Sequence, residues 1–140
     1  MTTETLDLAR RAVAAVPLGG WPEGFLAINK KTGKPLGRVH KLTSGGGLIV
    51  REMPWKMVSH LYLPDLNDPA TKGCLLHLVR EAAEEPNLIV VWCDYEGRFV
   101  AIDGVYRGRA GEIHTSPVTL YGTGDTEIAA LVAALEAGGQ

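Results

Sequence analysis

The sequence is poor in features that mark several large classes of protein. Only two of its 140 residues are cysteines, which excludes a disulfide scaffold and predicts two reduced, buried thiols. No apolar run approaches the roughly 20 residues of a membrane-spanning helix. Residues 1–7 are polar and acidic, unlike a secretory signal. We therefore expect a cytoplasmic chain with no membrane partner.

A strong charge of one sign is also absent. The chain has 14 Lys and Arg against 16 Asp and Glu, a formal net charge of -2. This balance argues against global capture of nucleic acid, though not against a local basic patch, and nucleic acid is therefore the least favoured partner. One stretch is locally basic, and is either a solvated lysine-rich hairpin or a surface that contacts phosphates. Its cationic or potentially cationic residues are Lys30, Lys31, Lys34, Arg38, His40, Lys41 and Arg51.

The chain does contain enough apolar residues for a core. Hydrophobic residues make up 46% and charged residues 21% of the sequence. Its length is typical of one domain, so we expect a single domain over residues 1–140. The 17 glycines and 8 prolines predict many turns between short elements.

Three segments have the apolar spacing of helices. The N-terminal one covers residues 3–16, the central one follows an N-cap at Asp68, and the C-terminal one follows a cap at Asp125 or Thr123. Residues 21–63 hold weaker strand candidates. The pattern predicts an α+β fold, with a mainly antiparallel sheet of about five to six strands packed by three helices on one face.

Three strands are expected between the central and C-terminal helices. They cover residues 88–95, 98–106 and 112–121, and a two-residue turn at Glu96-Gly97 joins the first two. Hairpins rather than crossovers connect them, which predicts antiparallel pairing. A one-residue slip in the second turn is left open, and it would move Glu112 and His114 to the other face.

This meander separates two kinds of side chain. One face is apolar and is expected to carry the helices; it includes Ile89, Val91, Cys93, Val100 and Ile102. The opposite face is expected to meet solvent, and aromatic rings there need a cover such as a ligand, a partner subunit or a loop. Its chemistry-bearing residues are Trp92, Asp94, Phe99, Asp103, Arg107, Glu112 and His114.

The mixed face suits a planar, charged ligand. The rings of Trp92 and Phe99 stack on a base, arginines hold phosphate bidentately, and carboxylates accept hydrogen bonds from ribose hydroxyls. The alternative is an ordinary solvent face in which Arg107 and Glu112 form a cross-strand pair. The candidate ligand-binding residues are Trp92, Asp94, Phe99, Asp103, Arg107, Arg109 and His114.

Patterns for catalysis and metal binding are weak. Asp103 and His114 would be the acid–base pair of a hydrolase, but no nucleophile accompanies them. Cys74 and His77 share a helix face at a spacing that metal ligands use, without a second pair of ligands. We therefore expect no catalytic residue, no metal and no cofactor.

Residues 63–82 form a distinctive block with the sequence LPDLNDPATKGCLLHLVREA. A Trp-Pro-Glu-Gly turn at 21–24 and an alanine-rich segment at 127–136 accompany it. In these three features the chain resembles small accessory proteins of tailed bacteriophages and prophages. The resemblance implies a phage protein that acts in the host bacterial cytoplasm, and it assigns no activity and no functional residue.

These observations lead to one functional hypothesis and two alternatives. The first is a non-enzymatic phage protein that counters a bacterial defence system by sequestering a nucleotide-derived signalling molecule. The alternatives are an inhibitor that docks on a host protein complex such as a nuclease, and a small hydrolase that uses Asp103 and His114. A homo-oligomer that buries Trp55, Trp92 or Phe99 is a further expectation.

Overall fold

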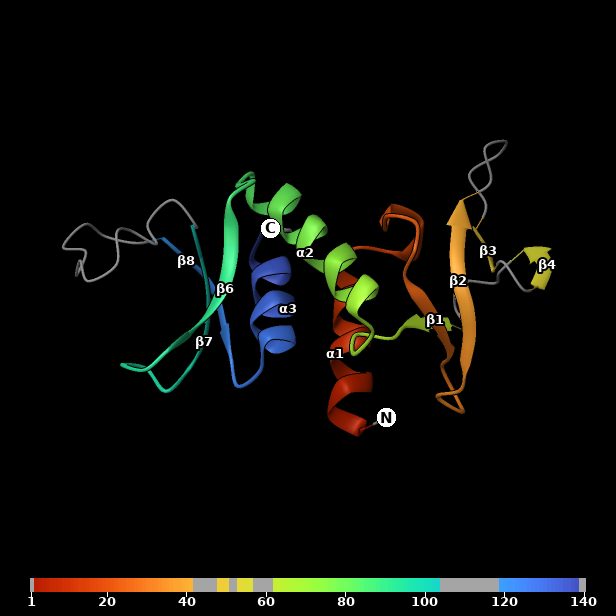
Figure 1. Ribbon diagram of the computed structural model, residues 1–140, viewed down its shortest axis with the longest axis horizontal. Coiled ribbons are helices and arrows are strands. Elements are labelled where there is room, and N and C mark those ends of the chain that lie inside the picture. Colours follow the sequence, from red (N-terminus) through yellow and green to blue (C-terminus); the bar gives the residue numbers. More distant parts are fainter. Residues whose placement is uncertain (1, 42–47, 51–52, 57–61, 104–118, 139–140) are drawn as a thin grey trace. The chain divides into compact units, whose positions relative to one another are not determined.

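The computed structural model in Figure 1 describes residues 2–41, 48–50, 53–56, 62–103 and 119–138. It contains two compact units, Met1–His77 and Leu78–Gln140. The single domain expected over residues 1–140 stays a prediction, because compactness does not show whether either unit folds alone. Within the described residues, no helix is long and apolar enough to cross a membrane.

The first unit begins with a capped helix and continues into a sheet. Helix α1 is held at its start by Thr2, whose hydroxyl accepts a hydrogen bond from the backbone N–H of Thr5 at 3.2 Å. A single 3₁₀ turn, η1, follows it. The elements are α1 (Thr3–Ala15), η1 (Leu18–Gly20), β1 (Leu26–Asn29), β2 (Pro35–Lys41), β3 (Leu48–Val50), β4 (Met53–Lys56) and β5 (Tyr62–Pro64), followed by the first part of α2 (Pro69–Ala83).

The strands of the first unit form one antiparallel sheet in the order β4-β3-β2-β1-β5. Its core includes the rings of Trp21 and Phe25, which are fully buried and meet edge to face at 5.6 Å. The indole N–H of Trp21 donates to the carbonyl oxygen of Val16 at 2.7 Å, which satisfies the polar atom of this ring. The weak strand candidates of residues 21–63 thus form a sheet, in which consecutive strands pair from β1 to β4 and β5 pairs with β1.

The second unit contains the rest of α2 and a three-stranded antiparallel sheet with the order β6-β7-β8. Its elements are β6 (Leu88–Cys93), β7 (Arg98–Asp103), β8 (Leu120–Gly124) and α3 (Glu127–Gly138). The α+β class, the antiparallel pairing and the three helices are confirmed. The expected single sheet of five to six strands differs, because the described strands pair as two separate sheets, with α2 between them in the chain.

The β6–β7 hairpin has a longer turn than the sequence predicts. Cys93 pairs with Arg98, so Asp94–Gly97 form a four-residue turn instead of the two-residue turn at Glu96-Gly97. Gly97 has a φ of 68°, and its N–H donates to the carbonyl of Cys93 at 2.8 Å, a geometry that favours glycine. The pairing shifts by two residues, and therefore the same residues share a face as predicted.

Strand β8 and helix α3 correct another expectation. The sequence ends the last strand at residue 121 and caps the helix at Thr123 or Asp125, yet Gly122 and Gly124 lie within β8. A Cβ built on Gly122 would lie 2.5 Å from the backbone nitrogen of Ala134, so α3 packs directly on this strand. The cap is Thr126, whose hydroxyl accepts from the N–H of Ala129 at 3.1 Å, rather than Asp125 or Thr123.

The helix therefore covers the opposite sheet face from the one expected. Gly122 pairs with Ala101 and Gly124 pairs with Phe99, and directly paired residues share a face. Figure 1 shows α3 lying along one face of the β6–β7–β8 sheet. This face carries Trp92 and Phe99, whereas the apolar residues Ile89, Val91, Cys93, Val100 and Ile102 point away from α3. Small side chains, rather than the most hydrophobic ones, determine where the helix packs.

Candidate functional site

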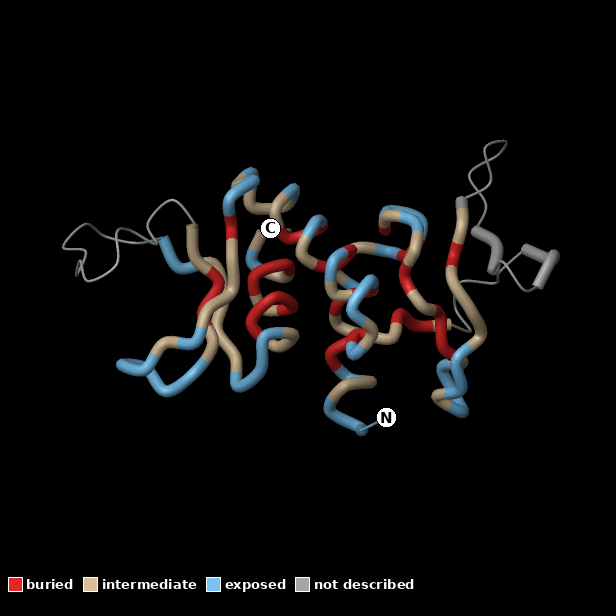
Figure 2. Tube along the Cα trace, in the orientation of Figure 1, coloured by how far each residue is buried: buried red, intermediate tan, exposed pale blue. Residues whose placement is uncertain are grey.

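The strongest candidate site is the outer part of the β6–β7 hairpin, which we call the aromatic hairpin and define as Trp92, Asp94, Tyr95 and Phe99. Trp92 and Phe99 are directly paired across the two strands. Their ring centroids lie 5.1 Å apart with an interplanar angle of 76°, an edge-to-face contact. Figure 2 shows that this end of the hairpin is exposed, while α3 is buried along much of its length.

The indole ring of Trp92 is both exposed and oriented. Helix α3 packs mainly on β8, and β6, which carries Trp92, is the strand at the other edge of the sheet. The side chain of Trp92 therefore stays 51% exposed, although it lies on the same sheet face as the helix. Its indole N–H donates to Asp94 Oδ1 at 2.9 Å. Together with the edge of Phe99, this hydrogen bond limits rotation of the indole and leaves a flat apolar surface that faces solvent.

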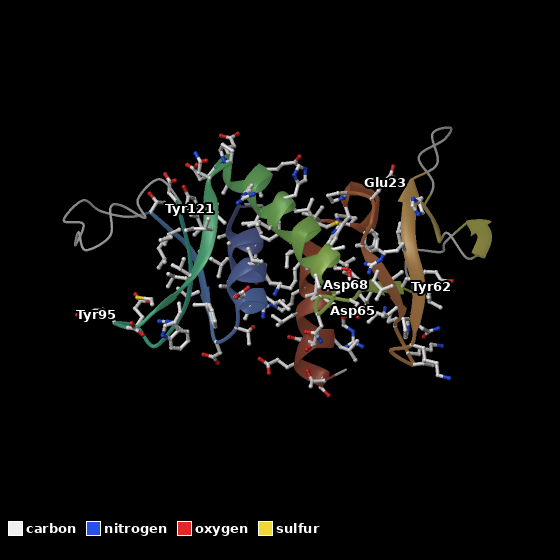
Figure 3. The ribbon with its side chains drawn as sticks, in the orientation of Figure 1. Glu23, Tyr62, Asp65, Asp68, Tyr95 and Tyr121 are labelled. Atoms are coloured by element: carbon white, nitrogen blue, oxygen red, sulfur yellow. The ribbon has the colours of Figure 1, made fainter. Side chains whose placement is uncertain are left out.

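The turn adds a second exposed ring. Tyr95 is 98% exposed and lies at the outer tip of the hairpin, as Figure 3 shows. The charges beside it are mostly compensated: Arg98 Nε lies 3.4 Å from Glu96 Oε2, and its Nη1 donates to the hydroxyl of Thr123 at 3.2 Å. Arg98 pairs with Cys93 and therefore belongs to the sheet face opposite Trp92. The described part of the aromatic hairpin can hold a ring more readily than a phosphate.

The other predicted site residues divide into two groups. Asp103 shares the face of Trp92 and Phe99, but it pairs with Leu88 at the far end of the hairpin. Asp103 follows Phe99 by four positions along the strand, a distance of about 13 Å. Arg107, Arg109 and His114 lie outside the described residues, so the phosphate-binding half of the predicted site and the Asp103–His114 pair stay predictions.

A second polar cluster joins the start of α2 to the first sheet. Asp68 is nearly buried and binds Arg38 of β2 through both of its carboxylate oxygens, with Arg38 Nη2 donating to Asp68 Oδ1 at 2.7 Å. Asp68 Oδ2 also accepts from the backbone N–H and the hydroxyl of Thr71, both at 3.0 Å. Leu26 of β1 in turn donates its N–H to that hydroxyl at 2.9 Å.

The cluster fixes the charge of Asp68. The hydrogen-bonded guanidinium of Arg38, together with the two donors of Thr71, lowers the pKa of Asp68 to about 2. The sequence predicted Asp68 as the N-cap, which its hydrogen bond from the backbone N–H of Thr71 confirms. It did not reveal Arg38 as the partner, because the pair spans 30 residues. We interpret this cluster as a structural clamp, since each of its polar groups is already bound within the protein.

The thiol of Cys74 has a structural environment as well. It is buried, and its Sγ lies 3.6 Å from the carbonyl oxygen of Glu23 and 3.9 Å from that of Pro22. Burial raises the pKa of the Cys74 thiol, which disfavours the reactive thiolate. In the part of the chain that the structure describes, no group of three or more His, Cys, Asp and Glu residues is placed to hold a metal ion.

The basic stretch is only partly available for an external anion. Arg38 is bound to Asp68, and His40 Nδ1 lies 3.9 Å from Glu23 Oε2. Lys30, Lys31 and Lys34 are exposed around the β1–β2 turn. The side chains of Lys41 and Arg51 lie outside the described residues.

Comparison with known proteins gives no assignment. No protein-family model, curated protein or solved structure matches the chain. The resemblance to small phage proteins therefore stays an expectation from the sequence. Among the described residues, the aromatic hairpin is the feature that internal packing explains least.

Proposed function

We propose that this chain is a non-enzymatic binding protein that takes a planar, nucleotide-like ligand on its aromatic hairpin. The observation that carries the proposal is Trp92, a half-exposed indole whose orientation is set by Asp94 and Phe99. A base would stack on this ring, a contact that contributes about 1–3 kcal/mol. The second oxygen of Asp94 would accept a hydrogen bond from a ribose hydroxyl.

The biological role proposed for this binding is sequestration. The resemblance to phage accessory proteins suggests action in the cytoplasm of a bacterial host, where a bound signal nucleotide would no longer activate a defence system. Arg107 and Arg109 are the predicted phosphate ligands, and they follow β7 in the sequence. A sponge of this kind releases its ligand unchanged, which separates it from an enzyme.

Thermal unfolding in the presence of linear and cyclic mono- and dinucleotides tests the proposal. A ligand at about 100 times its Kd stabilises the protein by about 2.7 kcal/mol, which raises the melting temperature. Trp92→Ala is expected to weaken binding about tenfold or more through loss of stacking. Chromatography of ligand released by heating should return the same molecule.

The matched control is Asp94→Asn, which keeps one carbonyl oxygen to accept from the Trp92 indole and loses both the charge and the second acceptor oxygen. It should retain the stacking contribution that Trp92→Ala loses. The proposal is wrong if no nucleotide changes the melting temperature, or if Trp92→Ala binds as tightly as the original protein. A chemically changed product would support the hydrolase interpretation instead.

A host protein is the second candidate partner, and two exposed side chains favour it. Tyr95 is 98% and Leu120 is 51% exposed, and Leu120 pairs with Ile102 on the sheet face turned away from α3. Exposed aromatic and aliphatic residues of this kind form the centre of many protein interfaces. Leu120→Ser, which lies outside the aromatic hairpin, should weaken co-purification with a host nuclease complex while leaving nucleotide binding intact.

A further inference from the structure

The β1–β2 turn is an ordered loop that displays three ammonium groups. The side chain of Asn29 accepts hydrogen bonds from the backbone N–H groups of Lys31 at 2.8 Å and Thr32 at 3.1 Å. Gly33 adopts a φ of 72° and donates its N–H to the carbonyl of Asn29 at 2.8 Å. These bonds fix the backbone of the turn. The lysine turn, which we define as Lys30, Lys31 and Lys34, is therefore held on a rigid hairpin.

The net charge of -2 is the sum of two units whose formal charges have opposite signs. Residues 1–77 contain ten Lys and Arg against six Asp and Glu, a formal charge of +4. Residues 78–140 contain four against ten, a formal charge of -6. Each unit creates its own local field, because screening limits interactions to about 10 Å at ordinary ionic strength. The argument against nucleic acid depended on the charge of the whole chain, and it does not apply to the locally basic first unit.

An aromatic side chain lies beside the lysine turn. Tyr62 of β5 pairs directly with Asn29, the residue that organises the turn, and directly paired residues share a sheet face. Tyr62 is partly exposed, and Figure 3 labels it on the strand next to this hairpin. Proteins that bind single-stranded nucleic acid combine two elements: cations that contact the backbone and an aromatic ring that stacks on a base. The lysine turn and Tyr62 provide both.

We propose that the lysine turn and Tyr62 form a contact site for a single nucleic-acid strand, separate from the aromatic hairpin. The lysines would contact successive phosphates, and the tyrosine ring would stack on a base between them. An anionic membrane fits less well, because Thr32, the exposed residue between the lysines, is polar, and the turn offers no apolar side chain for insertion. Phosphate contacts of this type carry no sequence preference.

Fluorescence anisotropy of a labelled single-stranded oligonucleotide tests the site over about 50–200 mM salt. The triple variant K30Q/K31Q/K34Q should bind about tenfold or more weakly, and its log–log salt slope should be shallower by about 2, from roughly 0.7 per lost phosphate contact. Arg10→Gln is the matched control, because Arg10 is exposed on α1 and its loss changes the charge of the first unit without touching the turn.

Tyr62 gives an independent readout. Tyr62→Ala should weaken binding about tenfold with an unchanged salt slope, while Tyr62→Phe should bind like the original protein, because stacking needs only the ring. Circular dichroism checks that each variant is folded. Since the lysines are exposed, the triple variant tests the proposal even where Tyr62→Ala fails to fold.

Three results would contradict the proposal that the lysine turn and Tyr62 bind a nucleic-acid strand. Absence of oligonucleotide binding, or equal binding by the triple variant and Arg10→Gln, would show that the turn is only a solvated hairpin. Binding to mixed phosphatidylcholine–phosphatidylserine vesicles in preference to the oligonucleotide would indicate a membrane contact. Because the triple variant keeps every residue of the aromatic hairpin, it should retain the rise in melting temperature that mononucleotides cause, and failure of this proposal is distinguishable from failure of the aromatic hairpin.

Discussion

Gly122→Ala is expected to destabilise the protein by about 2–3 kcal/mol, a large effect for one added methyl group. The new Cβ would lie 2.5 Å from Ala134 N, 2.6 Å from Ala130 O and 2.9 Å from Ala134 Cα. These are backbone atoms of α3, and they cannot rotate away as the end of a flexible side chain can. The helix would have to lift from β8, with loss of packing around the buried Leu131 and Leu135.

Urea unfolding followed by circular dichroism measures this effect, with Gly73→Ala as the matched control. Gly73 lies inside α2, and a Cβ there would meet nothing within 4 Å. Because alanine favours helix over glycine, this control should stabilise the protein by up to about 1 kcal/mol. Equal stability of Gly122→Ala and the original protein would show that α3 does not pack on the glycines of β8.

Asp68→Asn is expected to lower the free energy of unfolding by about 2 kcal/mol at neutral pH. The substitution removes the charge that binds Arg38 and weakens the acceptor for Thr71, which together join α2 to the first sheet. Arg38 is partly exposed, so solvent screening keeps the loss below that of a fully buried pair. Capping alone contributes about 1 kcal/mol of the total.

The loss should depend on pH with a definite sign. The folded-state pKa of Asp68 is lowered from 3.8 to about 2, so the ionised carboxylate stabilises the folded chain fully above about pH 4. That contribution disappears as the pH falls toward 2, and the stability difference between the original protein and Asp68→Asn should shrink over the same range. Asp65→Asn, in the same loop, is the control. A difference that stays constant down to pH 2 would contradict this role of Asp68.

Local rules predicted the helices well because their signals lie within a few residues. Asp68 before Pro69 marks the start of α2, and the structure places the helix at Pro69–Ala83. The strands of the first unit were weak in the sequence, since they are only three to seven residues long. Local rules could not predict the pairing of β1 with β5, because Tyr62 and its partner Asn29 are distant in the sequence. The Arg38–Asp68 pair was missed for the same reason.

The candidate site was predicted in part. Alternation along β6 and β7 placed Trp92 and Phe99 on one face, and the structure brings their rings together. The same reasoning assigned the helix to the wrong face, because it followed hydrophobicity alone. Close approach of α3 requires small residues, and these are Ala101, Gly122 and Gly124. The composition of residues 122–125, Gly-Thr-Gly-Asp, is typical of a turn, and the sequence therefore did not reveal that β8 continues to Gly124.

We propose that the exposed indole of Trp92 is a ligand-binding surface. The most direct measurement is the nuclear magnetic resonance signal of its indole N–H during titration with nucleotides. Trp21 is an internal reference, because its indole is fully buried and bound to Val16. If the ligand stacks on Trp92, we expect a saturable shift of the Trp92 signal with little change in the Trp21 signal. A bound nucleotide that leaves the Trp92 signal unmoved would contradict it.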